Sequence, residues 1–102
     1  MPVTFSNQQD TLTAYLAGEL DHHSAAAIRE AVDEMVEGAL PKTLILDFEK
    51  VPFMDSSGIG LIMGRYRTME SVGGSLAVEH VSPQLKKLMN LGGLSRLPIT
   101  IR

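Results

Sequence analysis

One stretch decides the fold: Leu44-Ile45-Leu46-Asp47-Phe48-Glu49-Lys50-Val51-Pro52-Phe53-Met54-Asp55-Ser56-Ser57-Gly58-Ile59-Gly60. Its apolar first half predicts a buried strand, and a short loop follows. Asp55-Ser56-Ser57 then stands where a helix should begin. Two hydroxyls and a carboxylate are therefore placed at a helix N-terminus, where unpaired N–H groups and the macrodipole favour negative charge.

Length and composition describe one soluble domain. The chain has 102 residues, 44% of them apolar, which suffices for a single core. It contains no cysteine, which excludes disulfides and thiolate chemistry and agrees with a reducing cytoplasm. The formal net charge of −3 argues against nucleic-acid binding. No segment has the length of a membrane span or the pattern of a signal peptide, so we expect a cytoplasmic protein.

The segments before the decisive stretch predict a hairpin and a helix. Residues 3–5 and 11–18 read as two strands joined by a polar turn. A helix follows, with Asp21 or Ser24 as its N-terminal cap. Its apolar stripe at helical spacing comprises Ile28, Ala31, Val32, Met35, Val36 and Ala39.

The decisive stretch itself predicts a central strand and a second helix. Residues 42–48 are apolar on both faces, which is typical of a parallel strand covered by helices. The helix should run from about residue 57 to residue 72. Gly58, Gly60 and Gly64 in its first two turns each cost about 1 kcal/mol of helix propensity relative to alanine. Gly60, Gly64 and Thr68, spaced by four, form a small-residue face, so we expect close packing of this helix on the sheet or on a partner.

The remaining elements indicate an α/β fold. Residues 75–79 and 98–101 predict strands, and Ser82-Pro83 opens a third helix between them. Strands that alternate with helices after an opening hairpin predict a mixed, mostly parallel sheet with helices packed on it. Functional loops of such sheets follow the carboxyl ends of the strands. Asp21-His22-His23 and Asp55-Ser56-Ser57 should therefore lie on one edge.

Asp55-Ser56-Ser57 has two interpretations. Ser and Asp before a helix most often serve as caps. Alternatively, a serine accepts phosphate, which a helix N-terminus tolerates and which adds about two negative charges beside Asp55. Repulsion between this doubly charged phosphate and one carboxylate at ~5 Å costs roughly 2 kcal/mol even in water-like screening. Because a tenfold change in affinity takes about 1.4 kcal/mol, one phosphate is enough to switch a protein interface.

Enzymatic interpretations find less support. Ser57-Gly58-Ile59-Gly60 is not a G-x-S-x-G nucleophile motif, and His22, His23 and His80 lack the spacing of a triad. Adjacent histidines at a helix start point in different directions, which disfavours a metal site. Neither phosphate-binding glycine motif occurs. We therefore expect no catalytic residue, no metal and no cofactor.

An aspartyl phosphotransfer domain is a further alternative, because Asp47 ends a central strand as an acceptor aspartate would. Such a domain needs an acidic cluster after its first strand, where Asn7-Gln8-Gln9-Asp10 supplies only one carboxylate. Of the methionines, Met54 and Met63 are expected to be exposed near the site.

Three motifs together resemble the signatures of STAS domains: Gly18-Glu19-Leu20-Asp21, Leu44-Ile45-Leu46-Asp47 and Phe53-Met54-Asp55-Ser56-Ser57-Gly58-Ile59-Gly60. Asp21-His22-His23-Ser24 and residues 61–66 are most similar to the sporulation-type branch, the anti-sigma F factor antagonists of Gram-positive bacteria. The resemblance covers nearly the whole chain. It implies a single STAS-type sandwich over residues 1–102.

The resemblance also implies partner switching in transcription regulation. Family members are not enzymes; they bind an anti-sigma factor serine kinase and so release a sigma factor. The kinase phosphorylates the second serine of Asp-Ser-Ser-Gly, which is Ser57 here, and a PP2C-type, metal-dependent serine phosphatase reverses this. The implied partner-binding residues are Asp21, His22, His23, Met54, Asp55, Ser56, Ser57, Gly58 and Ile59.

Two expectations qualify the resemblance. Relatives usually continue into a C-terminal helix, whereas this sequence ends at Arg102. Either the helix is absent from this protein or the sequence is trimmed before it. A missing helix would leave part of the sheet less covered and favour self-association, although a monomer is the favoured state. A STAS module of another signalling complex, such as a stressosome-like scaffold, remains the alternative function.

Overall fold

A computed structural model of the chain describes residues 2–102. Its five-stranded sheet has the order β1-β2-β3-β4-β5, with β1 antiparallel to β2 and all other neighbours parallel. The strands are β1 (Val3–Gln8), β2 (Thr11–Ala17), β3 (Thr43–Lys50), β4 (Ser75–Glu79) and β5 (Thr100–Ile101). The helices are α1 (His22–Ala39), α2 (Ser56–Ser71), α3 (Pro83–Leu91) and the short 3-10 helix η1 (Leu94–Arg96). The predicted α/β class, with an N-terminal hairpin and a mostly parallel sheet, is confirmed.

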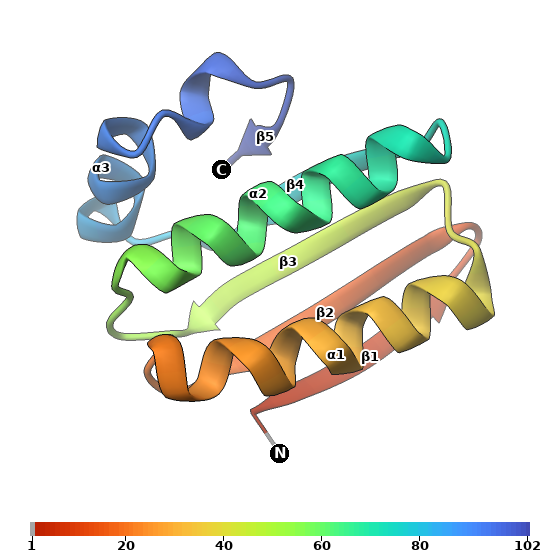
Figure 1. Cartoon of the computed structure of the whole chain (residues 1–102), viewed down its shortest axis with the longest axis horizontal. Helices are drawn as coiled ribbons and strands as arrows, with labels where there is room; N and C mark the ends of the chain where they lie inside the picture. Colours follow the sequence, from red (N-terminus) through yellow and green to blue (C-terminus); the bar gives the residue numbers. More distant parts are fainter. Residues whose placement is uncertain (1) are drawn as a thin grey trace.

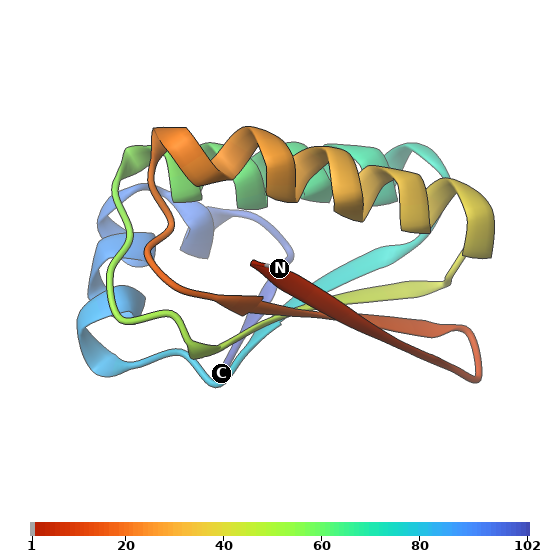
Figure 2. The same cartoon turned by 90° about the horizontal axis from the view of Figure 1, so that it is seen from below.

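The two long helices form one layer over the sheet. α1 and α2 lie side by side on the same face (Figures 1 and 2), and α3 lies near the N-terminal end of α2 (Figure 1). Alternate residues of β2 and β3 point toward this layer and are fully buried: Leu12, Ala14, Leu16, Leu44, Leu46 and Phe48. The helices meet them with Ile28, Val32, Val36, Leu61, Ile62 and Met69. Within residues 2–102, no helix is both long and apolar enough to cross a bilayer.

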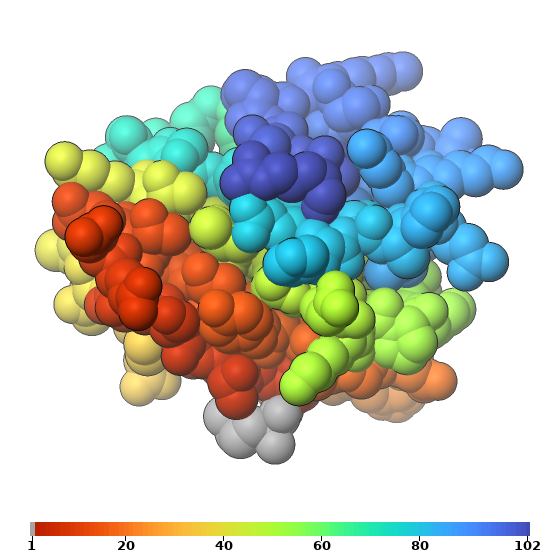
Figure 3. All heavy atoms as spheres, turned by 180° about the vertical axis from the view of Figure 1, so that it is seen from behind, coloured from red at the N-terminus to blue at the C-terminus, as the bar shows by residue number. Residues whose placement is uncertain are grey.

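The opposite face of the sheet is open, so the expectation that helices cover β3 on both sides is wrong. Figure 3 views this face, on which segments from β1 to β5 reach the surface. Tyr15 is exposed here and Ile45 is half-buried. Because α1 and α2 both cross over the same face, these helices cover only one side of β3. The expectation arose because Ile45, which points to the open face, is apolar like the residues that face the helices.

The hairpin is longer than expected. β1 extends to Gln8 and pairs with β2 over its full length, which leaves only Gln9 and Asp10 in the turn. Both turn residues have positive φ, 49° and 66°. Two-residue hairpin turns favour this backbone because its twist matches that of the flanking strands. Asn7 and Gln8, which looked like loop residues, therefore belong to an edge strand.

Candidate functional site

The two loops predicted to share an edge are hydrogen-bonded to each other. Leu20 and Met54 form an isolated parallel bridge that continues the pairing of β2 with β3. The Leu20 N–H donates to the Phe53 carbonyl at 3.0 Å, and the Asp55 N–H donates to the Leu20 carbonyl at 3.1 Å. Asp21 and Asp55 follow directly. The N-termini of α1 and α2 therefore lie next to each other, as Figure 1 shows, and their common-edge placement is confirmed.

Asp21 caps α1 in a reciprocal capping box. Its Oδ1 accepts hydrogen bonds from the N–H groups of His23 (2.9 Å) and Ser24 (3.0 Å). In return, Ser24 Oγ accepts from the Asp21 N–H at 3.1 Å. The Ser24 N–H, followed by that of His23, lowers the pKa of the Asp21 carboxyl from its ordinary value. Asp21 is thus a fixed anion at this edge.

Asp55 plays the same part for α2. Its Oδ1 accepts from the Ser57 N–H at 2.8 Å, and its carbonyl accepts from the Gly58 N–H at 3.0 Å. The helix starts at Ser56, one residue earlier than predicted. Ser56 is exposed and Ser57, in the first turn, is half-buried. A phosphate on Ser57 would therefore stand beside the Asp55 carboxylate and at a helix N-terminus.

Met54 does not belong to the surface, and the expectation of its exposure is wrong. It is only 3% exposed. A Cβ built on Gly58 would lie 2.1 Å from Met54 Cγ and 3.2 Å from Leu20 Cδ2. Gly58, itself buried, is therefore the residue that lets α2 begin directly over the Met54 side chain. Neither residue offers a surface to a partner; together they hold the Asp55 loop from below.

Ile59 and Met63 are half-buried and pack against the core, so Met63 is less exposed than expected. A Cβ on Gly92, which follows α3, would contact the Ile59 side chain at 3.1 Å. Ile59 therefore joins α2 to the end of α3. The exposed members of the predicted set are His22, His23 and Ser56, and the two imidazole rings are 4.0 Å apart.

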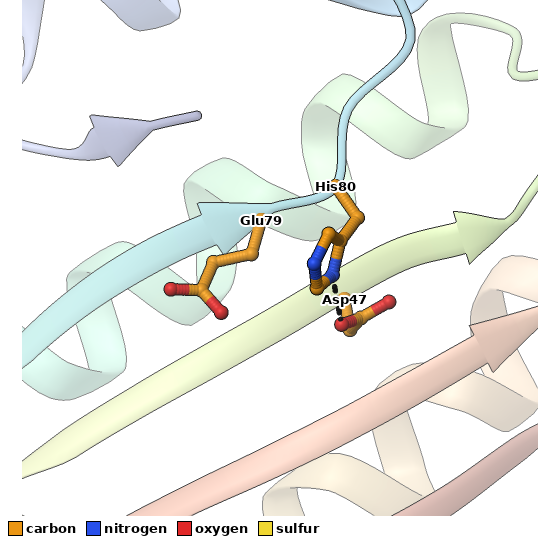
Figure 4. A group of neighbouring side chains, drawn as sticks. All are labelled: Asp47, Glu79 and His80. Atoms are coloured by element: carbon orange, nitrogen blue, oxygen red, sulfur yellow. Dashed lines mark hydrogen bonds and ion pairs between the residues drawn. The ribbon is translucent and has the colours of Figure 1, made fainter.

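Sequence reasoning missed a polar cluster on the open face. Asp47 is only 4% exposed, and its carboxylate forms a 2.6 Å hydrogen bond with His80 Nδ1. Its second oxygen accepts from the Glu49 N–H at 2.9 Å. Glu79 lies next to them (Figure 4) and pairs with Arg102. No sequence signal could reveal the pair, because β3 and β4 bring together residues 33 positions apart.

This cluster has the donor types of a cation site, and its ligand atoms all lie within 4.8 Å of one another. Each group already has a protein partner, however: His80 with Asp47, and Glu79 with Arg102. The use of both Asp47 oxygens also removes support for the phosphotransfer alternative, which requires a free carboxylate oxygen. We therefore treat the cluster as structural.

Replacing Asp47 by Asn is expected to lower the pKa of His80. The hydrogen bond to Asp47, then the charge of that carboxylate, raises this pKa above its ordinary value, and Glu49 and Glu79 add to it. A raised folded-state pKa stabilises the fold below about pH 6.5, the ordinary histidine value, and this contribution is lost as pH rises through the folded pKa. NMR titration of the His80 imidazole in both proteins checks the shift; equal pKa values would contradict the pairing.

Comparison with known proteins agrees with this architecture. Residues 3–102 match the STAS domain family. The chain is 33% identical over 97 residues to the anti-sigma F factor antagonist of Paenibacillus polymyxa, covering 95% of this chain and 83% of that protein. It is similar to the anti-sigma factor antagonist SpoIIAA in its unphosphorylated form (31% identity, TM-score 0.76, 98% of this chain and 86% of that one). The Bacillus SpoIIAA in its phosphorylated form gives 34% identity and a TM-score of 0.74, over 98% and 90% of the two chains.

The chain therefore belongs to the STAS family and has its α/β fold. Within that family, these similar proteins are anti-sigma factor antagonists.

Proposed function

We propose that this chain is a cytoplasmic anti-sigma factor antagonist that Ser57 phosphorylation inactivates. Unphosphorylated, it binds an anti-sigma factor serine kinase, which then releases its sigma factor. The kinase phosphorylates Ser57, and a PP2C-type phosphatase restores the active form. The chain itself is a regulatory module without catalytic residues.

One observation carries the proposal: Ser57 stands in the first turn of α2, at the edge where the Asp21 and Asp55 loops are hydrogen-bonded together. Asp55 holds the Ser57 backbone N–H at 2.8 Å, so the position of Ser57 is well defined. The names of its relatives and the existence of a phosphorylated SpoIIAA structure support the same proposal.

The site is suited to an electrostatic switch. The Asp21 and Asp55 carboxylates are fixed as helix caps and cannot turn away without losing those hydrogen bonds. A phosphate on Ser57 adds about two negative charges to this edge. The fold tolerates that charge because N–H groups and the helix dipole favour an anion at this end of α2. Phosphorylation therefore changes the affinity for a partner and leaves the fold of the domain unchanged.

The assignment of Ser57 is tested by incubating the protein with the cognate anti-sigma factor kinase and ATP, followed by mass mapping. We expect one phosphate on Ser57 and complete loss of phosphorylation in Ser57→Ala. Ser56→Ala is the matched control, since Ser56 precedes Ser57 at the same helix start and should leave phosphorylation intact. Phosphate found only elsewhere, or equal labelling of Ser57→Ala, would overturn the assignment.

A further inference from the structure

A groove of about 500 Å³ runs between α1 and α2 and has Ser57 in its wall. Small residues line it from both helices: Ala25 and Ala26 from α1, Gly60 and Gly64 from α2. All residues that line the groove belong to α1 or α2. These two helices cover the face of the sheet opposite the open one (Figure 2).

The fold does not need the two glycines of this groove. A Cβ built on Gly60 or on Gly64 would meet no atom within 4 Å, whereas one on Gly58 would collide with Met54. Glycine in a helix lowers its stability relative to alanine. Close packing within the domain therefore explains Gly58 only, whereas close approach of a partner at Gly60 and Gly64 stays a prediction. Gly60 and Gly64 weaken α2 and leave space that the domain itself does not fill.

The groove also has a positive floor. Arg65 lines it and is only 7% exposed, with Nε 2.9 Å from Asp33 Oδ1. Among the described residues, its buried Nη1 has no hydrogen-bond partner. Arg29 lines the same groove and lies close enough to Arg65 to lower its pKa, after the larger effect of burial. Within residues 2–102, Arg65 pairs with Asp33 and no ion pair of Arg29 is found. Buried donors such as Arg65 Nη1 normally have partners.

We propose that the groove receives a helix of the anti-sigma factor kinase that carries an acidic side chain. The inference rests on the proposed function, since it names how that partner is held. The carboxylate pairs with Arg65 and Arg29, for which guanidinium forks are well matched. The partner helix approaches closely over Gly60 and Gly64, since the distance between packed helices depends on the side chains at their contact. A helix seated there keeps Ser57, in the same wall, next to the kinase.

The glycine test fills the groove while sparing the fold. Gly64→Ala and Gly64→Leu are compared with Gly38→Ala and Gly38→Leu, because Gly38 is an exposed α1 position whose Cβ also meets nothing within 4 Å. Both alanine variants should keep or raise the denaturation midpoint. Gly64→Leu should weaken binding of the purified cognate kinase at least about tenfold, with a smaller loss for Gly64→Ala, and Gly38→Leu should change it by less than about twofold.

The charge test uses exposed arginines. Arg29→Glu should weaken kinase binding about tenfold and increase its dissociation rate, because it places a carboxylate opposite the partner's own. Arg67→Glu is the control: it makes the same charge change on an exposed α2 residue that does not line the groove. It should change the affinity by less than about threefold. This test stands even if Gly64→Leu fails to fold.

The outcomes separate the two proposals. If the wild-type protein neither binds the kinase nor is phosphorylated at Ser57, the proposed function itself fails. If wild type binds and Gly64→Leu and Arg29→Glu bind equally well, the docking inference is overturned and the function stands. Dimerisation of the wild type that Gly64→Leu abolishes, with kinase binding unchanged, would assign the groove to a second copy and would also overturn it.

Discussion

Ser57→Asp is expected to weaken binding of the anti-sigma factor kinase by more than about tenfold, which corresponds to about 1.4 kcal/mol. The new carboxylate joins Asp55, whose own carboxylate holds the Ser57 N–H at 2.8 Å, and the capping Asp21 next to it. Repulsion between such charges is about 1 kcal/mol per pair in water, and it increases when a bound partner excludes solvent from this edge, so binding becomes less favourable. Isothermal titration calorimetry measures the affinity.

The same variant should fold normally. A carboxylate in the first turn of a helix is stabilising by about 0.3–1 kcal/mol, which offsets much of its repulsion by Asp55, so the free energy of unfolding should change by less than about 1 kcal/mol. Denaturant unfolding of both proteins checks this. Ser57→Asn has nearly the same shape without the charge and serves as the control. If Ser57→Asn weakens binding as much as Ser57→Asp does, shape and not charge governs the switch.

Met54→Ala is expected to lower the free energy of unfolding by about 2–5 kcal/mol, the usual range for truncating a buried methionine. The Met54 side chain fills the space beneath Gly58 and is 3% exposed. Its removal leaves a cavity under the first turn of α2. Denaturant unfolding measures the loss.

Met54→Leu separates packing from partner contact. Leucine nearly conserves the volume, so we expect a loss below about 1.5 kcal/mol and unchanged kinase affinity. A surface contact made by the methionine itself would produce the opposite pattern: small stability effects in both variants and weaker binding in both. That result would contradict the buried position of Met54.

Local contacts and long-range contacts both contribute to the features described above. The caps are local: Asp21 and Asp55 bind N–H groups two or three residues away, and such contacts depend on sequence spacing alone. The groove and the Asp47–His80 pair are not local, because they require α1 beside α2 and β3 beside β4. Hydrophobic periodicity and capping motifs do not indicate which helices or strands become neighbours.

The glycines of α2 show a feature that the sequence alone could not predict. In the sequence, Gly58, Gly60 and Gly64 look alike, as three costs to the same helix. In the folded protein, Gly58 is required by Met54 beneath it, whereas Gly60 and Gly64 face open space.

The sequence by itself determined the α/β class, the order of the elements, both helix caps and the shared edge of the Asp21 and Asp55 loops. It could do so because periodicity, capping and strand direction act over short separations along the chain. Only the tertiary structure decided that one face of the sheet stays open, that Met54 is buried, and that a positive groove adjoins Ser57. These features depend on which helices and strands become neighbours in the folded domain. Packing between residues far apart in the sequence decides that arrangement.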